Sequence, residues 1–118
     1  MTNSRAKGAK GERELANILK DRGYNTRRGQ QYCGSNGDAD VVGVPGLHIE
    51  VKRTEKCMPY KYLDQATSDA RDDELPVVFH RQNNKEWIAI LSMDYFMDLF
   101  EMAQGKNWDK ETNNLYKD

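Results

Sequence analysis

The sequence predicts a domain of the α/β or α+β class, in which helices flank one sheet. Two observations lead to this prediction. Apolar residues recur at helical spacing in three segments, and short runs of alternating or continuous apolar residues separate these segments. The resulting order is one helix, three strands, a second helix, two strands and a third helix. That order is typical of a sheet with helices packed against it.

Length and composition favour a single domain over residues 1–118, with residues 1–6 and 106–118 expected to be flexible. Apolar residues make up 37% and charged residues 31%, which predicts a globular but polar protein. No run approaches the roughly 20 apolar residues of a membrane span, and the basic N-terminus lacks the apolar segment of a secretory signal. Cys33 and Cys57 are therefore expected to be reduced thiols in the cytoplasm, with a bridge between them as the alternative.

The first predicted helix spans residues 7–22, and Gly23 is a typical residue for its end. Residues 24–28 are expected to form a strand. Residues 29–37 contain three glycines with Ser and Asn, which predicts a loop. The apolar face of the helix consists of Leu15, Ala16 and Leu19, with Ile18 beside it.

Residues 38–44 and 47–53 are predicted to be two strands joined at Pro45-Gly46, a strong turn signal. The second strand alternates strictly between apolar and polar side chains, so its two faces must differ. Its apolar face consists of Leu47, Ile49 and Val51, and its polar face of His48, Glu50 and Lys52.

The C-terminal half is predicted to contain a helix at 60–72, a hairpin of strands 76–81 and 86–91, and a final helix capped by Ser92. Phe79, Trp87 and Ile88 are expected to be core residues. The last helix presents a row of apolar residues that fits either the core or a dimer surface, namely Met93, Phe96, Met97 and Phe100.

Acidic side chains on the two neighbouring strands are candidates for chemistry. Asp38 and Asp40 share one face of their strand, and pairing through the turn brings Asp40 towards Glu50. Two close carboxylates repel each other unless a divalent cation lies between them, and such oxygen ligands suit Mg²⁺. Lys52 on the same face could activate water or stabilise phosphate charge, which together favours metal-assisted phosphodiester hydrolysis. The alternative is a solvated polar face with cross-strand ion pairs.

Glu12 lies at the edge of the apolar face of the first helix. A carboxylate in that place is costly unless a cation or a hydrogen-bond donor meets it. It is therefore a further candidate for the site, although a solvated Glu that favours the helix dipole is the alternative.

Charge is distributed unevenly along the chain. Residues 1–30 carry eight Lys and Arg against three acidic residues, a net charge of +5, whereas residues 63–118 carry a net charge of −6. A basic end on an otherwise acidic chain suggests a polyanionic partner such as nucleic acid, with a solvated helix face as the alternative.

Three motifs together, "GAKGERELANIL", "DADVVGV" and "HIEVKRTEK", resemble the archaeal-type Holliday junction resolvases and their phage relatives, of the PD-(D/E)XK nuclease superfamily. "PGLHIEVKR" followed by a helix and "PVVFHR" is most similar to the small phage-encoded members. The resemblance covers roughly residues 5–100. It implies the restriction-endonuclease-like α/β fold, a central mixed five-stranded sheet flanked by helices.

The resemblance assigns catalysis to a helix Glu, a strand Asp and the Glu and Lys of E-x-K, which match Glu12, Asp40, Glu50 and Lys52. Asp40, Glu50 and the Val51 backbone carbonyl are expected to bind Mg²⁺, with Mn²⁺ as a substitute. Asp38 is a weaker candidate, and Gln65 corresponds to a Gln that some superfamily members place near the site. His48 stays unassigned. DNA contacts are expected from Arg5, Lys7, Lys10, Arg13, Arg27, Arg28 and Ser35.

The predicted function is a metal-dependent endonuclease for branched DNA, working as a homodimer because a four-way junction has two-fold symmetry. Its expected location is the cytoplasm of a prokaryotic or phage-infected cell. Two alternatives stay open. One is a nuclease of the same superfamily for ends, flaps or duplex DNA, and the other is a non-catalytic DNA-binding module. The Asp40–Glu50 connection is shorter than in the archaeal members, so DNA contacts there do not transfer.

Overall fold

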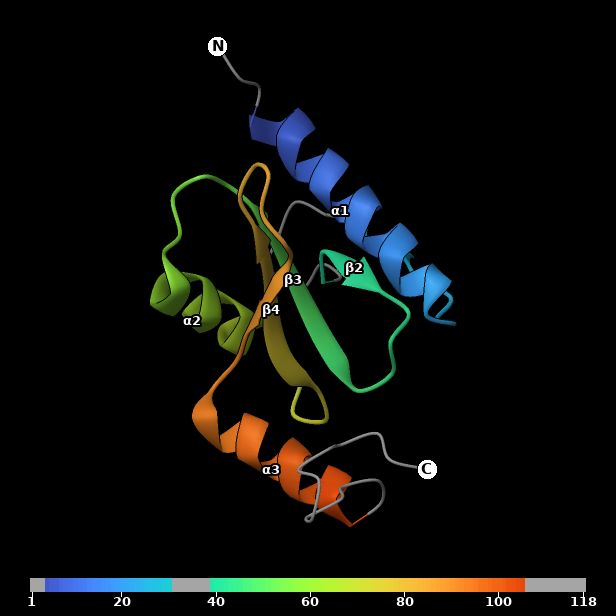
Figure 1. The fold of residues 1–118 in the computed structure, drawn as a ribbon, viewed down its shortest axis with the longest axis vertical. Helices are drawn as coiled ribbons and strands as arrows, with labels where there is room; N and C mark the ends of the chain where they lie inside the picture. Colours follow the sequence, from blue (N-terminus) through green and yellow to red (C-terminus); the bar gives the residue numbers. More distant parts are fainter. Residues whose placement is uncertain (1–3, 31–38, 106–118) are drawn as a thin grey trace.

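A five-stranded mixed sheet forms the centre of the protein, with helices on both of its faces (Figure 1). The computed structural model describes residues 4–30 and 39–105. The predicted order of elements, αβββαββα, is confirmed. The elements are α1 (Ser4–Asp21), β1 (Arg27–Arg28), β2 (Val41–Val42), β3 (Leu47–Arg53), α2 (Pro59–Asp69), β4 (Leu75–Arg81), β5 (Ile88–Ile90) and α3 (Met93–Gln104).

The strands lie in the order β1-β2-β3-β4-β5, so each strand neighbours the one before it in sequence. All neighbouring pairs are antiparallel except β3 and β4, which run parallel with Ile49 opposite Val77. A parallel pair needs a crossover connection, and α2 supplies it. The predicted mixed five-stranded sheet is thereby confirmed.

The two faces of β3 pack against different helices. On one face, Ile49 and Val51 join Leu15 and Ala16 of α1 in the main core. On the other face, a smaller cluster centres on α2, whose Ala66 packs with Val78 of the adjacent β4. Because helices cover both faces of the sheet, the polar side chains of β3 are shielded from water as its apolar side chains are.

Three strands are shorter than predicted. Of the predicted strand 86–91, only Ile88–Ile90 is a strand. Within residues 39–44, the described part of the predicted strand 38–44, only Val41–Val42 is a strand, because Gly43 has φ of 114° and passes close to the Asn25 backbone. A β-carbon at Gly43 would collide with the Asn25 carbonyl oxygen, so only glycine fits there. The segment 24–28 is a strand only at Arg27–Arg28, because Thr26 Oγ1 donates to the Ala16 carbonyl (2.6 Å) and ties the chain to α1.

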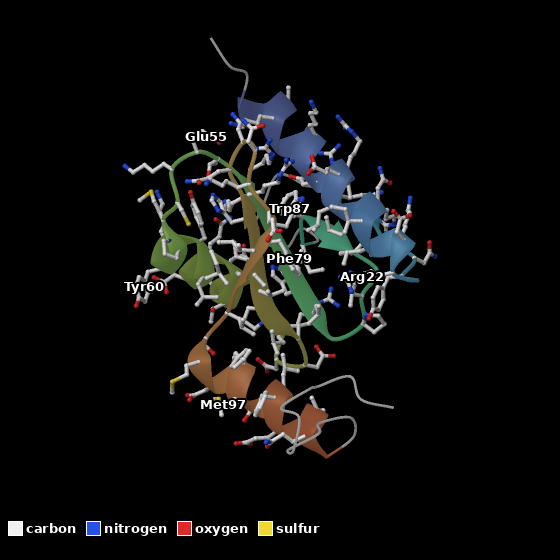
Figure 2. All side chains as sticks on the ribbon, viewed as in Figure 1. Arg22, Glu55, Tyr60, Phe79, Trp87 and Met97 are labelled. Carbon is white, nitrogen blue, oxygen red and sulfur yellow. The ribbon has the colours of Figure 1, made fainter. Side chains whose placement is uncertain are left out.

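The C-terminal half agrees with most expectations. Ser92 caps α3 as predicted, since its Oγ accepts a hydrogen bond from the Tyr95 N–H (3.2 Å). Phe79 and Trp87 pack against the core, and Figure 2 places both near the centre of the molecule. The expectation for Ile88 was wrong: its side chain is 50% exposed, because β5 is an edge strand.

Helix α3 lies at one end of the molecule, beyond the sheet (Figure 1), and none of its residues is buried. Its row of apolar side chains is therefore not part of the core. The alternative, a dimer surface, stays a prediction. Across the part of the chain that the structure describes, no helix is long and apolar enough to cross a membrane.

Candidate active site

Strand β3 places three polar side chains on the face that meets α2. His48 and Glu50 are each only 4% exposed, and Lys52 is half-buried. Their spacing of two residues puts them on one face of the strand, as the sequence predicted. A carboxylate as deeply buried as Glu50 is rare unless it is paired.

Asp40 lies opposite Glu50, just before β2. The Asp40 N–H donates to the Ile49 carbonyl (3.0 Å), and Asp40 Oδ2 accepts a hydrogen bond from the Val51 N–H (2.9 Å). The N–H and carbonyl of one strand residue point to the same neighbouring strand, so the Val51 carbonyl points towards this edge as well. The backbone pairing therefore brings the expected oxygen ligands together.

The two carboxyl groups share a hydrogen bond, and their pKa values shift in opposite directions. Burial, together with the charge of Glu50, raises the pKa of Asp40 to about 7. Burial also acts to raise the pKa of Glu50, but hydrogen bonds from His48 and Asp40 and the charges of His48 and Lys52 lower it below its usual value. The pair can therefore hold a proton at a pH at which an exposed carboxylate has released it. A divalent cation between the carboxylates would replace that proton.

Glu12 reaches the same region from α1. Gly11, just before it, is packed so tightly against β3 that a β-carbon there would lie 2.8 Å from the Arg53 β-carbon. This close approach brings Glu12 near enough for its charge to contribute to the raised pKa of Asp40. Its Oε1 accepts a hydrogen bond from Arg28 Nε (3.0 Å), so a cation does meet this carboxylate.

Lys52 is held at the edge of the site by two residues of α2. Its Nζ donates to Gln65 Oε1 (3.1 Å) and lies 5.3 Å from the centroid of the Tyr62 ring, a cation–π distance. The structure therefore places Gln65 beside the E-x-K lysine, where the resemblance suggested. The contact with Tyr62 was not foreseen, because only the packing of α2 reveals it.

The structure describes some of the residues that are expected to contact DNA and not others. Lys10, Arg13 and Arg27 are exposed, and Lys7 is half-buried. Arg28 is exposed and also binds Glu12, a contact that the sequence did not predict. Ser35, Asp38 and the side chain of Arg5 lie outside the described residues.

His48 makes a further contact with the Glu50 side chain that was not predicted. Its Nε2 lies 2.9 Å from Glu50 Oε1, a hydrogen bond between two buried side chains. The alternation along β3 gave the only signal, since it put His48 on the face of Glu50. His48, Glu50 and Asp69 also present ligand atoms within 4.8 Å of one another. Asp69 could not be foreseen, because it is an exposed residue at the end of α2.

Comparison with known proteins places the chain in a family. The sequence pattern of the family described as archaeal Holliday junction resolvase (Hjc) matches residues 3–67, more than half of the chain. No curated protein matches. Among solved structures, Hjc of Archaeoglobus fulgidus, described as a Holliday junction resolvase from an archaeal hyperthermophile, is 24% identical and has a TM-score of 0.55 over 72% of each chain. The match to the family pattern, together with this shared fold, shows that the chain belongs to the archaeal Holliday junction resolvase family.

Proposed function

We propose that this protein is a Mg²⁺-dependent endonuclease that cuts four-way DNA junctions. The observation that carries the proposal is the meeting of Asp40 and Glu50 on neighbouring strands, with Glu12 and Lys52 beside them. Membership of the family supports an endonuclease, and the solved relative from Archaeoglobus fulgidus is described as a Holliday junction resolvase.

The ligand set fits a hard cation. Asp40, Glu50 and the Val51 carbonyl offer oxygen atoms only, and oxygen ligands with several retained waters are what Mg²⁺ prefers. Mn²⁺ accepts the same ligands. When bound, the ion would neutralise phosphate charge and lower the pKa of a water molecule.

Lys52 and Glu12 complete the proposed chemistry from either side of the carboxylate pair. Gln65 and Tyr62 hold the Lys52 ammonium in place, so it is available to orient the attacking water or to stabilise charge on the scissile phosphate. The Arg28 contact holds Glu12 on the other side. Exposed basic residues of α1 and β1 would contact the DNA backbone; these are Lys10, Arg13 and Arg27. Contacts of this kind recognise the shape of the DNA and not its base sequence.

Cleavage of a synthetic four-way junction tests this mechanism. With Mg²⁺ or Mn²⁺, the wild type should nick the junction, and Glu50→Gln or Lys52→Ala should lower the rate by about 10²-fold or more while junction binding survives. The exposed Glu86→Gln is the matched control and should cleave like the wild type. Full cleavage by Glu50→Gln would refute the mechanism.

The two alternatives have their own discriminating measurements. Rates on a four-way junction, a flap and a linear duplex, compared side by side, separate a resolvase from a nuclease with another target. For the non-catalytic alternative, calorimetry with Mn²⁺ is decisive. If no ion binds even in the presence of DNA, the protein is a binding module.

We also propose that α3 mediates a homodimer, which symmetric cutting of a junction requires. Its exposed side chains include Met93 (74%), Met102 (62%) and Phe96 (50%), and apolar surface of this kind marks an association site. Sedimentation should show a dimer that Phe96→Asp weakens by tenfold or more. Tyr60→Asp, on the exposed side of α2 (Figure 2), should leave the dimer intact. A monomeric wild type at tens of micromolar would contradict this proposal.

A further inference from the structure

His48 is a buried histidine to which the proposed reaction gives no part. Its side chain is 4% exposed and lies on the α2 face of β3, two residues before Glu50. Two residues along a strand span about 6.7 Å. The imidazole bridges that gap, and its Nε2 reaches Glu50 Oε1 at 2.9 Å.

The opposite side of the ring is also defined. His48 Nδ1 lies 3.7 Å from Glu74 Oε1, and Glu74 is itself held by the Arg71 N–H, which donates to the same Oε1 (2.9 Å). Glu74 directly precedes β4, and Leu75 N–H donates to the Gly46 carbonyl (2.7 Å). The imidazole is thus fixed between the start of β4 and the Glu50 carboxylate, so its position does not depend on a bound ion.

Glu50 is therefore constrained from two directions. Asp40 approaches it from the neighbouring strand, where the proposed metal ligands meet, and His48 approaches along β3. A hydrogen bond to one carboxylate oxygen limits the rotation of the whole group. Such hydrogen bonds to metal-binding side chains typically contribute 10–100-fold to metal affinity.

We propose that His48 is a positioning residue, which holds the Glu50 carboxylate in the orientation that binds the catalytic cation. This inference rests on the proposed function, since it concerns the same metal site. It differs from a direct role for His48 as a ligand, which the proximity of Asp69 would otherwise suggest.

Two substitutions separate hydrogen bonding from packing. In His48→Gln the side-chain amide nitrogen is as many bonds from the backbone as Nε2, so it should still donate to Glu50. His48→Leu fills similar space without a donor. Titration of the DNA-free protein with Mn²⁺ by calorimetry should show about tenfold weaker binding for His48→Leu, and His48→Gln within about threefold of the wild type. The number of ions per chain should not change.

Kinetics add a second readout. Raising Mn²⁺ should restore most of the junction cleavage by His48→Leu, because only the affinity for the ion is reduced. A purely structural role would not produce a defect that metal rescues. If His48→Leu does not fold, His48→Asn replaces it, because this shorter amide cannot span the distance to Glu50.

Three results would overturn the inference. Equal Mn²⁺ affinity in the wild type and His48→Leu would show that the hydrogen bond does not position Glu50. Loss of a bound ion in His48→Gln, together with the same loss in Asp69→Asn, would make His48 a ligand. Failure of the wild type to bind Mn²⁺ at all would remove both the proposed function and this inference, whereas the first two results leave the nuclease proposal standing.

Discussion

The two faces of β3 are buried to the same extent but have opposite chemistry. On one face Ile49 is 1% exposed, and on the other Glu50 is 4% exposed. Ile49 packs against α1 in the main core, whereas Glu50 meets His48 and Asp40. Burial of an apolar side chain stabilises the fold, and burial of a carboxylate opposes it. The same strand therefore contributes to the stability of the fold through one face and holds the buried carboxylate of the proposed site on the other.

The fold tolerates the buried polar face of β3 because the polar groups on that face are paired. Within residues 4–30 and 39–105, no buried side-chain nitrogen or oxygen lacks a hydrogen-bond partner. Lys52 has Gln65, and Glu50 has His48. Breaking such a pair leaves a buried polar group unsatisfied, which costs more than the pair itself contributes. The apolar face has no such dependence on individual partners, and its contribution follows the volume that it fills.

The largest expected effect on stability comes from the apolar face. Ile49→Ala should lower the free energy of unfolding by about 2–5 kcal/mol, because it leaves a cavity between α1 and the sheet. Urea unfolding measures this change. Below its unfolding transition the variant should still cleave a junction, since the Ile49 side chain packs in the main core, on the face of β3 opposite Glu50.

Glu50→Gln is the matched change on the other face. Glutamine keeps the shape of the Glu50 side chain and removes its buried charge. The substitution should therefore alter the free energy of unfolding by less than Ile49→Ala, while it lowers the cleavage rate by about 10²-fold or more. If Glu50→Gln unfolded the protein as readily as Ile49→Ala, the division between a stabilising face and a functional face would be wrong.

The fold was predictable because its signals are local. Alternation in "LHIEVKR" gave β3 its exact bounds, and Pro45-Gly46 gave the turn that pairs it with β2. The sequence failed where a distant contact decides the backbone. Gly43 ends β2 because its backbone passes close to that of Asn25, and no residue near Gly43 in the sequence indicates this contact.

The closeness of the charged candidate residues was predictable, whereas the contacts that hold them were not. The strand pattern and the family resemblance placed Asp40, Glu50 and Lys52 together, and the structure brings them together. The contacts that hold these groups come from other elements: Arg28 on Glu12, and Tyr62 on Lys52. Side-chain pairs of this kind depend on how helices pack on the sheet, which a single sequence does not specify.

A smaller effect should appear on the polar face as pH changes. The pKa of Asp40 is raised from 3.8 to about 7 by burial and by the charge of Glu50. Between these values the folded protein holds a proton that the unfolded chain has released. The contribution of Asp40 to stability is therefore fully present below about pH 4 and is lost as pH rises through about 7.

Asp40→Asn isolates this contribution, because the amide does not titrate. Urea unfolding in the presence of a chelator, from pH 4 to pH 8, should show the wild type losing stability relative to Asp40→Asn up to about pH 7, with a constant difference above it. The exposed Asp72→Asn should run parallel to the wild type throughout. A constant difference between wild type and Asp40→Asn at every pH would mean that Asp40 titrates like an exposed residue. The polar face of β3 would then be hydrated, and the contrast between its two faces would be one of exposure and not of buried charge.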